Sequence, residues 1–93
     1  MQEDISQVEV IYRGRVQGVG FRYTVRSIAR SLKVAGWVKN LADGSVQLMA
    51  QADKQTLENF LNQIKEEFSG YIRDVDLTWN KPTQKWDSFE ITF

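Results

Sequence analysis

The chain has 93 residues, 42% of them hydrophobic and 26% charged, and its 12 basic residues balance 12 acidic ones. This length allows one domain, and this composition is that of an ordinary globular protein, which argues against a disordered chain. The absence of cysteine and histidine excludes disulfides, thiolate and imidazole metal ligands and histidine-based catalysis, and the zero net charge argues against a nucleic-acid partner.

The first third of the chain predicts a strand, a loop and a helix. The alternation of Val8, Val10 and Tyr12 indicates the strand, and the glycines of residues 14–20 indicate the loop. From residue 21 the apolar positions recur at helical spacing. They would form one face of a helix: Phe21, Val25, Ile28, Ala29 and Leu32.

A hairpin is predicted next. Residues 34–41 are expected to form a strand, and Asp43-Gly44 is a strong signal for the turn that follows it. The returning strand is indicated by three alternating apolar residues: Val46, Leu48 and Ala50.

The last part of the chain predicts a second helix and two strands. Asp53 is a candidate N-cap of this helix and Gly70 a candidate C-cap. Its expected apolar face comprises Leu57, Phe60, Leu61, Ile64 and Phe68. Residues 73–79 are expected to form a strand that places Trp79 in the core. A loop over residues 81–87 then leads to a short strand near the C-terminus.

This order of elements predicts an α+β fold of the ferredoxin-like type: βαββαβ plus a short C-terminal strand, in an antiparallel sheet with two helices on one face. We expect the domain to span residues 7–93, after a short tail of residues 1–6. The chain starts with Met1-Gln2-Glu3-Asp4, which is acidic where a signal peptide would be basic, and it has no apolar run of ~20 residues. We therefore expect a cytoplasmic protein with no membrane partner. We also expect it to be a monomer.

The start of the first helix is unusual. Gly18-Val19-Gly20-Phe21 offers no side chain to cap the free N–H groups of the first turn. Arg22 also places a cation at the positive end of the helix dipole, which is unfavourable by ~0.3–1 kcal/mol at exposed sites. An anion bound in the loop would explain both features. On the residues alone, an alternative is equally open. In it, water satisfies the free N–H groups and Arg22 points to solvent.

Two segments resemble the signatures of the acylphosphatase family: residues 14–22 (GRVQGVGFR), and residues 36–40 (GWVKN) followed by 43–46 (DGSV). The resemblance implies an enzyme that hydrolyses acyl phosphates to a carboxylate and inorganic phosphate, with no metal and no cofactor. It implies that Arg22 anchors the phosphoryl group and that Asn40 orients the attacking water. It further implies that the phosphate is held by the backbone amides of Arg15, Val16, Gln17, Gly18, Val19 and Gly20.

One departure from familiar members is the end of the first helix, where many have glycine and this chain has Leu32-Lys33-Val34. Other interpretations also stay open. Asparagine near a turn is more often turn chemistry than catalysis, and Asp43 is more readily a turn residue than a catalytic base. Asp74 and Asp76 are more readily part of a solvated strand face than ligands of a cation.

Two other function classes remain. Residues 20–23 faintly resemble the aromatic motif of RNA-recognition domains, which share this fold, although those aromatics belong on a central strand. The domain could instead have changed its task and become an anion sensor or a partner domain. Related domains occur inside larger proteins that handle carbamoyl groups. Trp37 and Trp86 are given no role.

Overall fold

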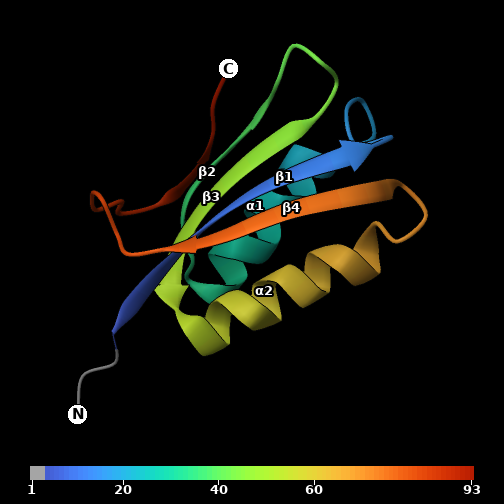
Figure 1. The fold of residues 1–93 in the computed structure, drawn as a ribbon. Helices are drawn as coiled ribbons and strands as arrows, with labels where there is room; N and C mark the ends of the chain where they lie inside the picture. The colour runs from blue at the N-terminus through green and yellow to red at the C-terminus, as the bar shows by residue number, and fades with distance from the viewer. Residues whose placement is uncertain (1–3) are drawn as a thin grey trace.

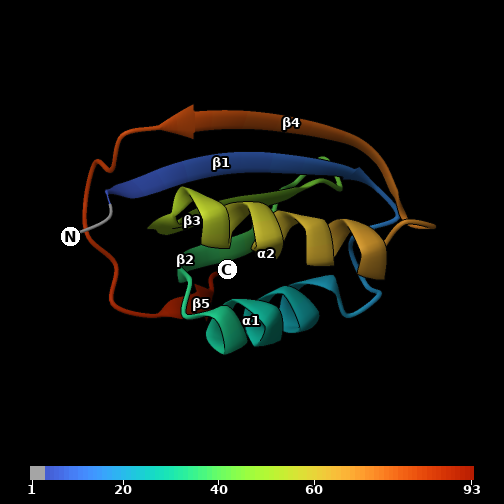
Figure 2. The same ribbon diagram turned by 90° about the horizontal axis from the view of Figure 1, so that it is seen from below.

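The computed structural model describes residues 4–93 and arranges them in two layers, a sheet and a pair of helices (Figure 1). The elements are β1 (Ile5–Gly14), α1 (Phe21–Leu32), β2 (Ala35–Asn40), β3 (Val46–Asp53), α2 (Lys54–Glu67), β4 (Ile72–Asn80) and β5 (Phe89–Ile91). Both helices cover the same face of the sheet (Figure 2). The ferredoxin-like fold expected from the sequence is confirmed.

The strands are ordered β4-β1-β3-β2-β5 across the sheet. Neighbours among the first four pair antiparallel, but β5 pairs parallel with β2, so the prediction of a wholly antiparallel sheet is wrong at this edge. The connection after β4 passes the end of the sheet at which β2 begins, and β5 therefore starts there and runs the same way as β2 (Figure 2).

The N-terminal boundary also differs slightly from expectation. β1 begins at Ile5, two residues before the expected start of the domain, and Ile5 is paired with Asp53 of β3. The first three residues of the expected tail lie outside the described residues. Among residues 4–93 no helix is long and apolar enough to cross a membrane.

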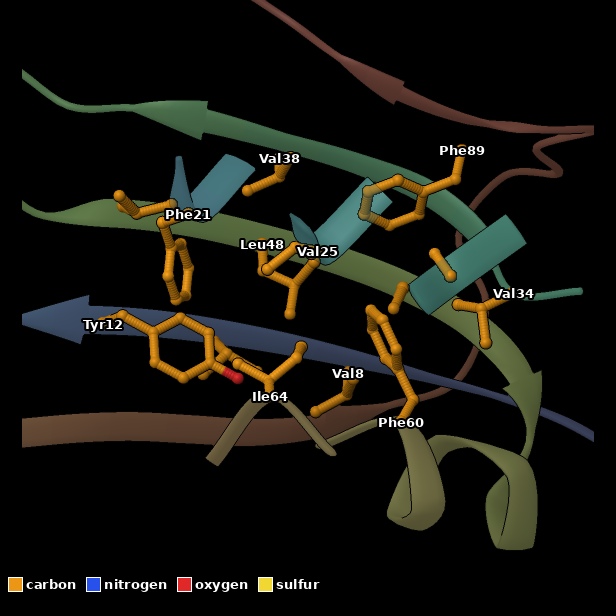
Figure 3. Packing of buried hydrophobic residues seen from close by; sticks show 14 of the residues in the cluster. Val8, Tyr12, Phe21, Val25, Val34, Val38, Leu48, Phe60, Ile64 and Phe89 are labelled. Atoms are coloured by element: carbon orange, nitrogen blue, oxygen red, sulfur yellow. The ribbon is translucent and has the colours of Figure 1, made fainter. Parts of the chain in front are cut away.

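The core fills the space between the sheet and the helices (Figure 3). Phe21 stands at the start of α1. The centre of its ring lies 5.1 Å from the centre of the Tyr12 ring on β1 and 4.7 Å from that of the Phe68 ring, which follows α2. The apolar faces predicted for the helices are confirmed, with these helical residues fully buried: Phe21, Val25 and Ala29 in α1, and Leu57, Phe60 and Ile64 in α2. This packing places the start of α1 directly beside the end of β1.

The two predicted caps of α2 have different outcomes. Asp53 is the N-cap as expected, because its carboxylate accepts a hydrogen bond from the Thr56 N–H at 3.1 Å. Gly70 is not the C-cap: α2 ends earlier, and Phe68 caps it with an ordinary φ of −118°. Phe68 is buried, and its carbonyl accepts hydrogen bonds from the N–H groups of Tyr71 and Ile72, which close the turn after the helix.

The prediction that Trp79 lies in the core is wrong, because its side chain is 38% exposed. It does share a face of β4 with Val75 and Leu77, as the alternation indicated. However, β4 is an edge strand, and α2 packs over β1 and β3 instead (Figure 2). A groove of about 680 Å³ therefore remains between α2 and β4, and the apolar face of β4 lines it.

Candidate active site

The strand register brings the glycine-rich loop and Asn40 to the same end of the sheet. Val46, the first residue of β3, is paired with Tyr12 of β1 on one side and with Asn40 of β2 on the other. The loop of residues 15–20 follows β1, and Asn40 ends β2 (Figure 1). Because side chains alternate along a strand, Asn40 shares the helix-covered face with the buried Val38. Its side chain thus lies on the face where α1 begins.

The loop itself turns its backbone N–H groups away from internal partners. Gly18 and Gly20 take left-handed conformations, with φ of 76° and 80°. Gly20 is the N-cap of α1 and, as the sequence predicts, no side chain caps it. Within residues 4–93, the backbone N–H groups of residues 16–23 donate no hydrogen bond, and the first bond of the helix runs from Thr24 to the Gly20 carbonyl at 3.0 Å. Several donors without an acceptor among the described residues therefore lie at the positive end of the helix dipole.

Arg15 differs from the rest of the loop. Its backbone N–H donates to the Tyr71 carbonyl at 2.8 Å, and its guanidinium carbon lies 5.5 Å from the centre of the Tyr71 ring. The Arg15 amide is thus committed to a protein carbonyl and is not free for an anion. The free donors begin at Val16, whose buried side chain anchors the loop to the core.

Arg22 lies in the first turn of α1, where no acidic residue balances it. Its side chain is half-buried, and the guanidinium carbon lies 5.2 Å from the centre of the Phe93 ring. The ion pairs found within residues 4–93 do not include Arg22. This positive charge at the start of a helix therefore remains available to an anion. Nothing in the sequence marked Phe93 as its neighbour.

Asn40 carries a buried acceptor that no protein donor satisfies. Its side-chain Oδ1 is the single buried side-chain nitrogen or oxygen without a hydrogen-bond partner in the described part of the chain. An unsatisfied buried group of this kind costs about 1–3 kcal/mol. The turn that follows does not use it, since Asp43 supplies the turn bonds. The interpretation of Asn40 as ordinary turn chemistry therefore loses its support.

The hairpin after Asn40 is held by Asp43 and Ser45. The Asp43 carboxylate accepts hydrogen bonds from the Ser45 backbone N–H at 2.9 Å and from its hydroxyl at 2.5 Å. These bonds confirm the predicted turn role of Asp43. The bond from the Ser45 hydroxyl, followed by that from its N–H, lowers the pKa of the Asp43 carboxyl below its ordinary value. A lowered pKa makes this carboxylate a weaker base, which disfavours it further as a catalytic base.

These bonds predict an acid-sensitive hairpin. Because the pKa of Asp43 is lower in the folded protein, its bonds stabilise the fold above the unfolded pKa of about 3.9 and lose this effect as the pH falls through the folded value. We expect Asp43→Ala to be less stable than the wild type by a constant difference above about pH 5. The difference should narrow below about pH 4. Urea unfolding of both proteins from pH 2.5 to 8 measures it, and a difference independent of pH would contradict this role.

From the sequence, Gln17 is expected to act only through its backbone amide. In the structure its side-chain Nε2 donates to the Leu41 carbonyl at 2.8 Å and to the Ser45 carbonyl at 2.9 Å. The partners are 24 and 28 residues away in the chain. No local pattern signals bonds of this range.

The other features singled out in the sequence lie elsewhere or are used structurally. Phe21 is buried and cannot stack on an RNA base. Asp76 forms an exposed ion pair with Arg13, and residues 4–93 contain no group of three or more acidic side chains close enough to share a metal ion. Trp37 and Trp86 are half-buried.

Comparison with known proteins points to one family along most of the chain. The family model described as Acylphosphatase matches residues 8–91. An acylphosphatase of Treponema denticola is 53% identical over 66 residues, which cover 71% of this chain and 70% of that protein. An acylphosphatase of Bacillus subtilis is 38% identical over 89 residues, covering 94% and 97% of the two chains. The crystal structure of acylphosphatase from Bacillus subtilis superposes with a TM-score of 0.88 over 95% of this chain and 99% of that one.

Proposed function

The chain belongs to the acylphosphatase family, and from that premise we propose how its own residues hydrolyse an acyl phosphate. The loop and Arg22 bind the phosphoryl group, and the Asn40 amide positions the water that attacks it. The observation that carries this proposal is the buried, unpartnered Oδ1 of Asn40, at the end of the sheet where the uncapped α1 begins. The oxygen is closed to solvent in this conformation, so the side chain must turn toward the bound phosphoryl group; a water molecule that donates to the oxygen there would satisfy it and be held for attack.

The phosphoryl group fits the loop by charge and by geometry. Its oxygens accept hydrogen bonds from the backbone N–H groups of Val16, Gln17, Gly18, Val19 and Gly20. The Arg15 amide, committed to Tyr71, takes no part. The helix dipole favours the negative charge, and the Arg22 guanidinium can donate two parallel hydrogen bonds to it. These donors are fixed by the fold before the reaction, so they stabilise the developing charge at little reorganisation cost.

The reaction then needs little acid–base chemistry. The oxygen of water bonds to phosphorus as the bond from phosphorus to the acyl oxygen breaks, and the electron pair of that bond leaves on the carboxylate. The conjugate acid of this leaving group has a pKa near ~4, so the carboxylate departs without protonation. A phosphoryl oxygen takes the proton of the water. Asn40 is a positioning group in this scheme, because an amide is a poor base.

The deciding experiment is hydrolysis of benzoyl phosphate by the purified protein in excess EDTA, beside Arg22→Ala and Asn40→Ala. We expect turnover that survives EDTA and collapses in both variants. Loss of turnover in EDTA would overturn the proposal that no metal is needed. Turnover that persists in either variant would remove that residue from its role.

We also propose that the protein works as a monomer in the cytoplasm, as expected from the sequence. Light scattering during size-exclusion chromatography tests the first point, and fractionation of cells that express the protein tests the second. A dimer mass, or recovery with the membranes, would contradict them.

A further inference from the structure

Gln17 is the side chain that joins the two halves of the site. It stands in the middle of the loop, is half-buried, and donates from the same Nε2 to two carbonyl oxygens of the hairpin. Both hydrogens of the amide are therefore used. Its partners are Leu41, the residue directly after Asn40, and Ser45.

The carbonyls that receive these bonds belong to a well-fixed turn. The Ser45 carbonyl also accepts the Leu41 N–H at 2.8 Å, and Ser45 is buried and bonded to Asp43. Gln17 thus ties the loop to a rigid backbone and not to a mobile side chain.

Few other bonds locate the loop relative to Asn40. Among residues 4–93, the hydrogen bonds between the loop of residues 15–20 and the hairpin of residues 41–45 come from Gln17 alone. Through the sheet the connection is indirect, because β3 lies between β1 and β2. Besides the strand register and the packing of Val16, the separation between the phosphate-binding amides and the Asn40 side chain therefore depends on this one amide.

We propose that the Gln17 side chain is a positioning residue, which sets the distance between the bound phosphoryl group and the water held by Asn40. The inference rests on the proposed function, because it assigns the loop to phosphate and Asn40 to water. In-line attack requires close alignment, and a displacement of about 1 Å can slow a reaction about a hundredfold. Loss of the two bonds should therefore affect kcat far more than the binding of phosphate.

The first test is Gln17→Met, which keeps the length and apolar volume of the side chain and removes both donors. We expect kcat for benzoyl phosphate to fall roughly ten- to a hundredfold, while the inhibition constant of inorganic phosphate changes less than about threefold. Gln47→Met is the matched control, because Gln47 donates to Glu9 on the opposite face of the sheet, and its kcat should stay within about twofold of the wild type.

A double variant separates positioning from a general structural role. If Gln17 acts through Asn40, Gln17→Met should slow the Asn40→Ala enzyme by less than about twofold, because the alignment that it serves is already lost. Equal fold-losses in both backgrounds would overturn the inference.

Gln17→Glu tests the same inference even if Gln17→Met does not fold. Its carboxylate has the same size but faces two carbonyl oxygens without a proton to share. Protonation restores one donor, so the ratio of its kcat to that of the wild type should rise as the pH falls. A flat ratio would overturn the inference. Absence of turnover in the wild type would overturn the proposed function with it, whereas normal turnover in folded Gln17→Met beside an active wild type would overturn this inference alone.

Discussion

Replacing Arg22 with lysine should reduce kcat/KM for benzoyl phosphate by roughly a hundred- to a thousandfold, the loss typical of one preorganised donor. Lysine keeps the positive charge but loses the planar pair of donors that matches two phosphoryl oxygens. It also loses the guanidinium, whose carbon lies 5.2 Å from the centre of the Phe93 ring. Steady-state kinetics at several substrate concentrations measure the effect.

Arg26→Lys is the matched control for this variant. Arg26 lies one turn further along α1, is also half-buried, and stacks on Tyr23, with 5.3 Å from its guanidinium carbon to the ring centre. It has no place in the site, so its kinetics should stay within about twofold of the wild type. Similar losses in both variants would point to a general effect on the helix, and near-normal turnover in Arg22→Lys would refute the role of Arg22.

Inorganic phosphate gives an independent measure of the same contact. As a competitive inhibitor it needs the loop and Arg22 but no attack by water. Its inhibition constant should therefore rise in Arg22→Lys. An unchanged constant together with a reduced kcat would place Arg22 on the departing carboxylate instead of the phosphoryl group.

Much of the architecture could be predicted because its signals are local. Alternating and helical spacing of apolar residues reflect which face of each element is buried, and those faces are the core in the structure. The uncapped start of α1 was also visible, since a helix N-terminus needs a capping side chain within a few residues. Phe21 belongs to both signals, because it is the first residue after the uncapped start and is buried beside Tyr12 at the end of β1.

What could not be predicted depends on contacts far apart in the chain. The exposure of Trp79 follows from the edge position of β4, and a strand pattern carries no information about which strand lacks a helix above it. The hydrogen bond from the Arg15 amide to the Tyr71 carbonyl joins segments that are 56 residues apart in the chain. The bonds of Gln17 to Leu41 and Ser45 are of the same kind. The candidate residues of the site were thus readable from the sequence, but the framework that aligns them was not.

The backbone conformation of Lys33 could not be predicted for a different reason. It follows α1 with a left-handed φ of 60°, and its N–H bonds to the carbonyls of Ala29 and Arg30. Glycine is the usual residue for this cap. The bonds to the end of the helix, with the burial of Val34 beside it, hold a lysine in a conformation that its own propensity disfavours.

Asn40→Ala should lower the activity of the protein without lowering its stability. We expect kcat for benzoyl phosphate to fall roughly a hundredfold or more, because the attacking water loses the group that aims it. The inhibition constant of phosphate should change less than about threefold, since the loop and Arg22 remain. The free energy of unfolding should stay equal or rise, because the substitution removes a buried acceptor that no group among residues 4–93 satisfies.

Asn80→Ala is the natural control, because Asn80 also ends a strand but is exposed and lies at the opposite end of the sheet, paired with Gln7 near the start of β1. It should change neither kcat nor phosphate binding. A destabilised Asn40→Ala with unchanged kcat would make Asn40 a structural residue, and weakened phosphate binding with retained turnover would reverse the assignments of the loop and Asn40. Lower activity without lower stability is the combination that a residue kept for catalysis should give, because no other group in the described part of the chain forms a hydrogen bond to its side-chain oxygen.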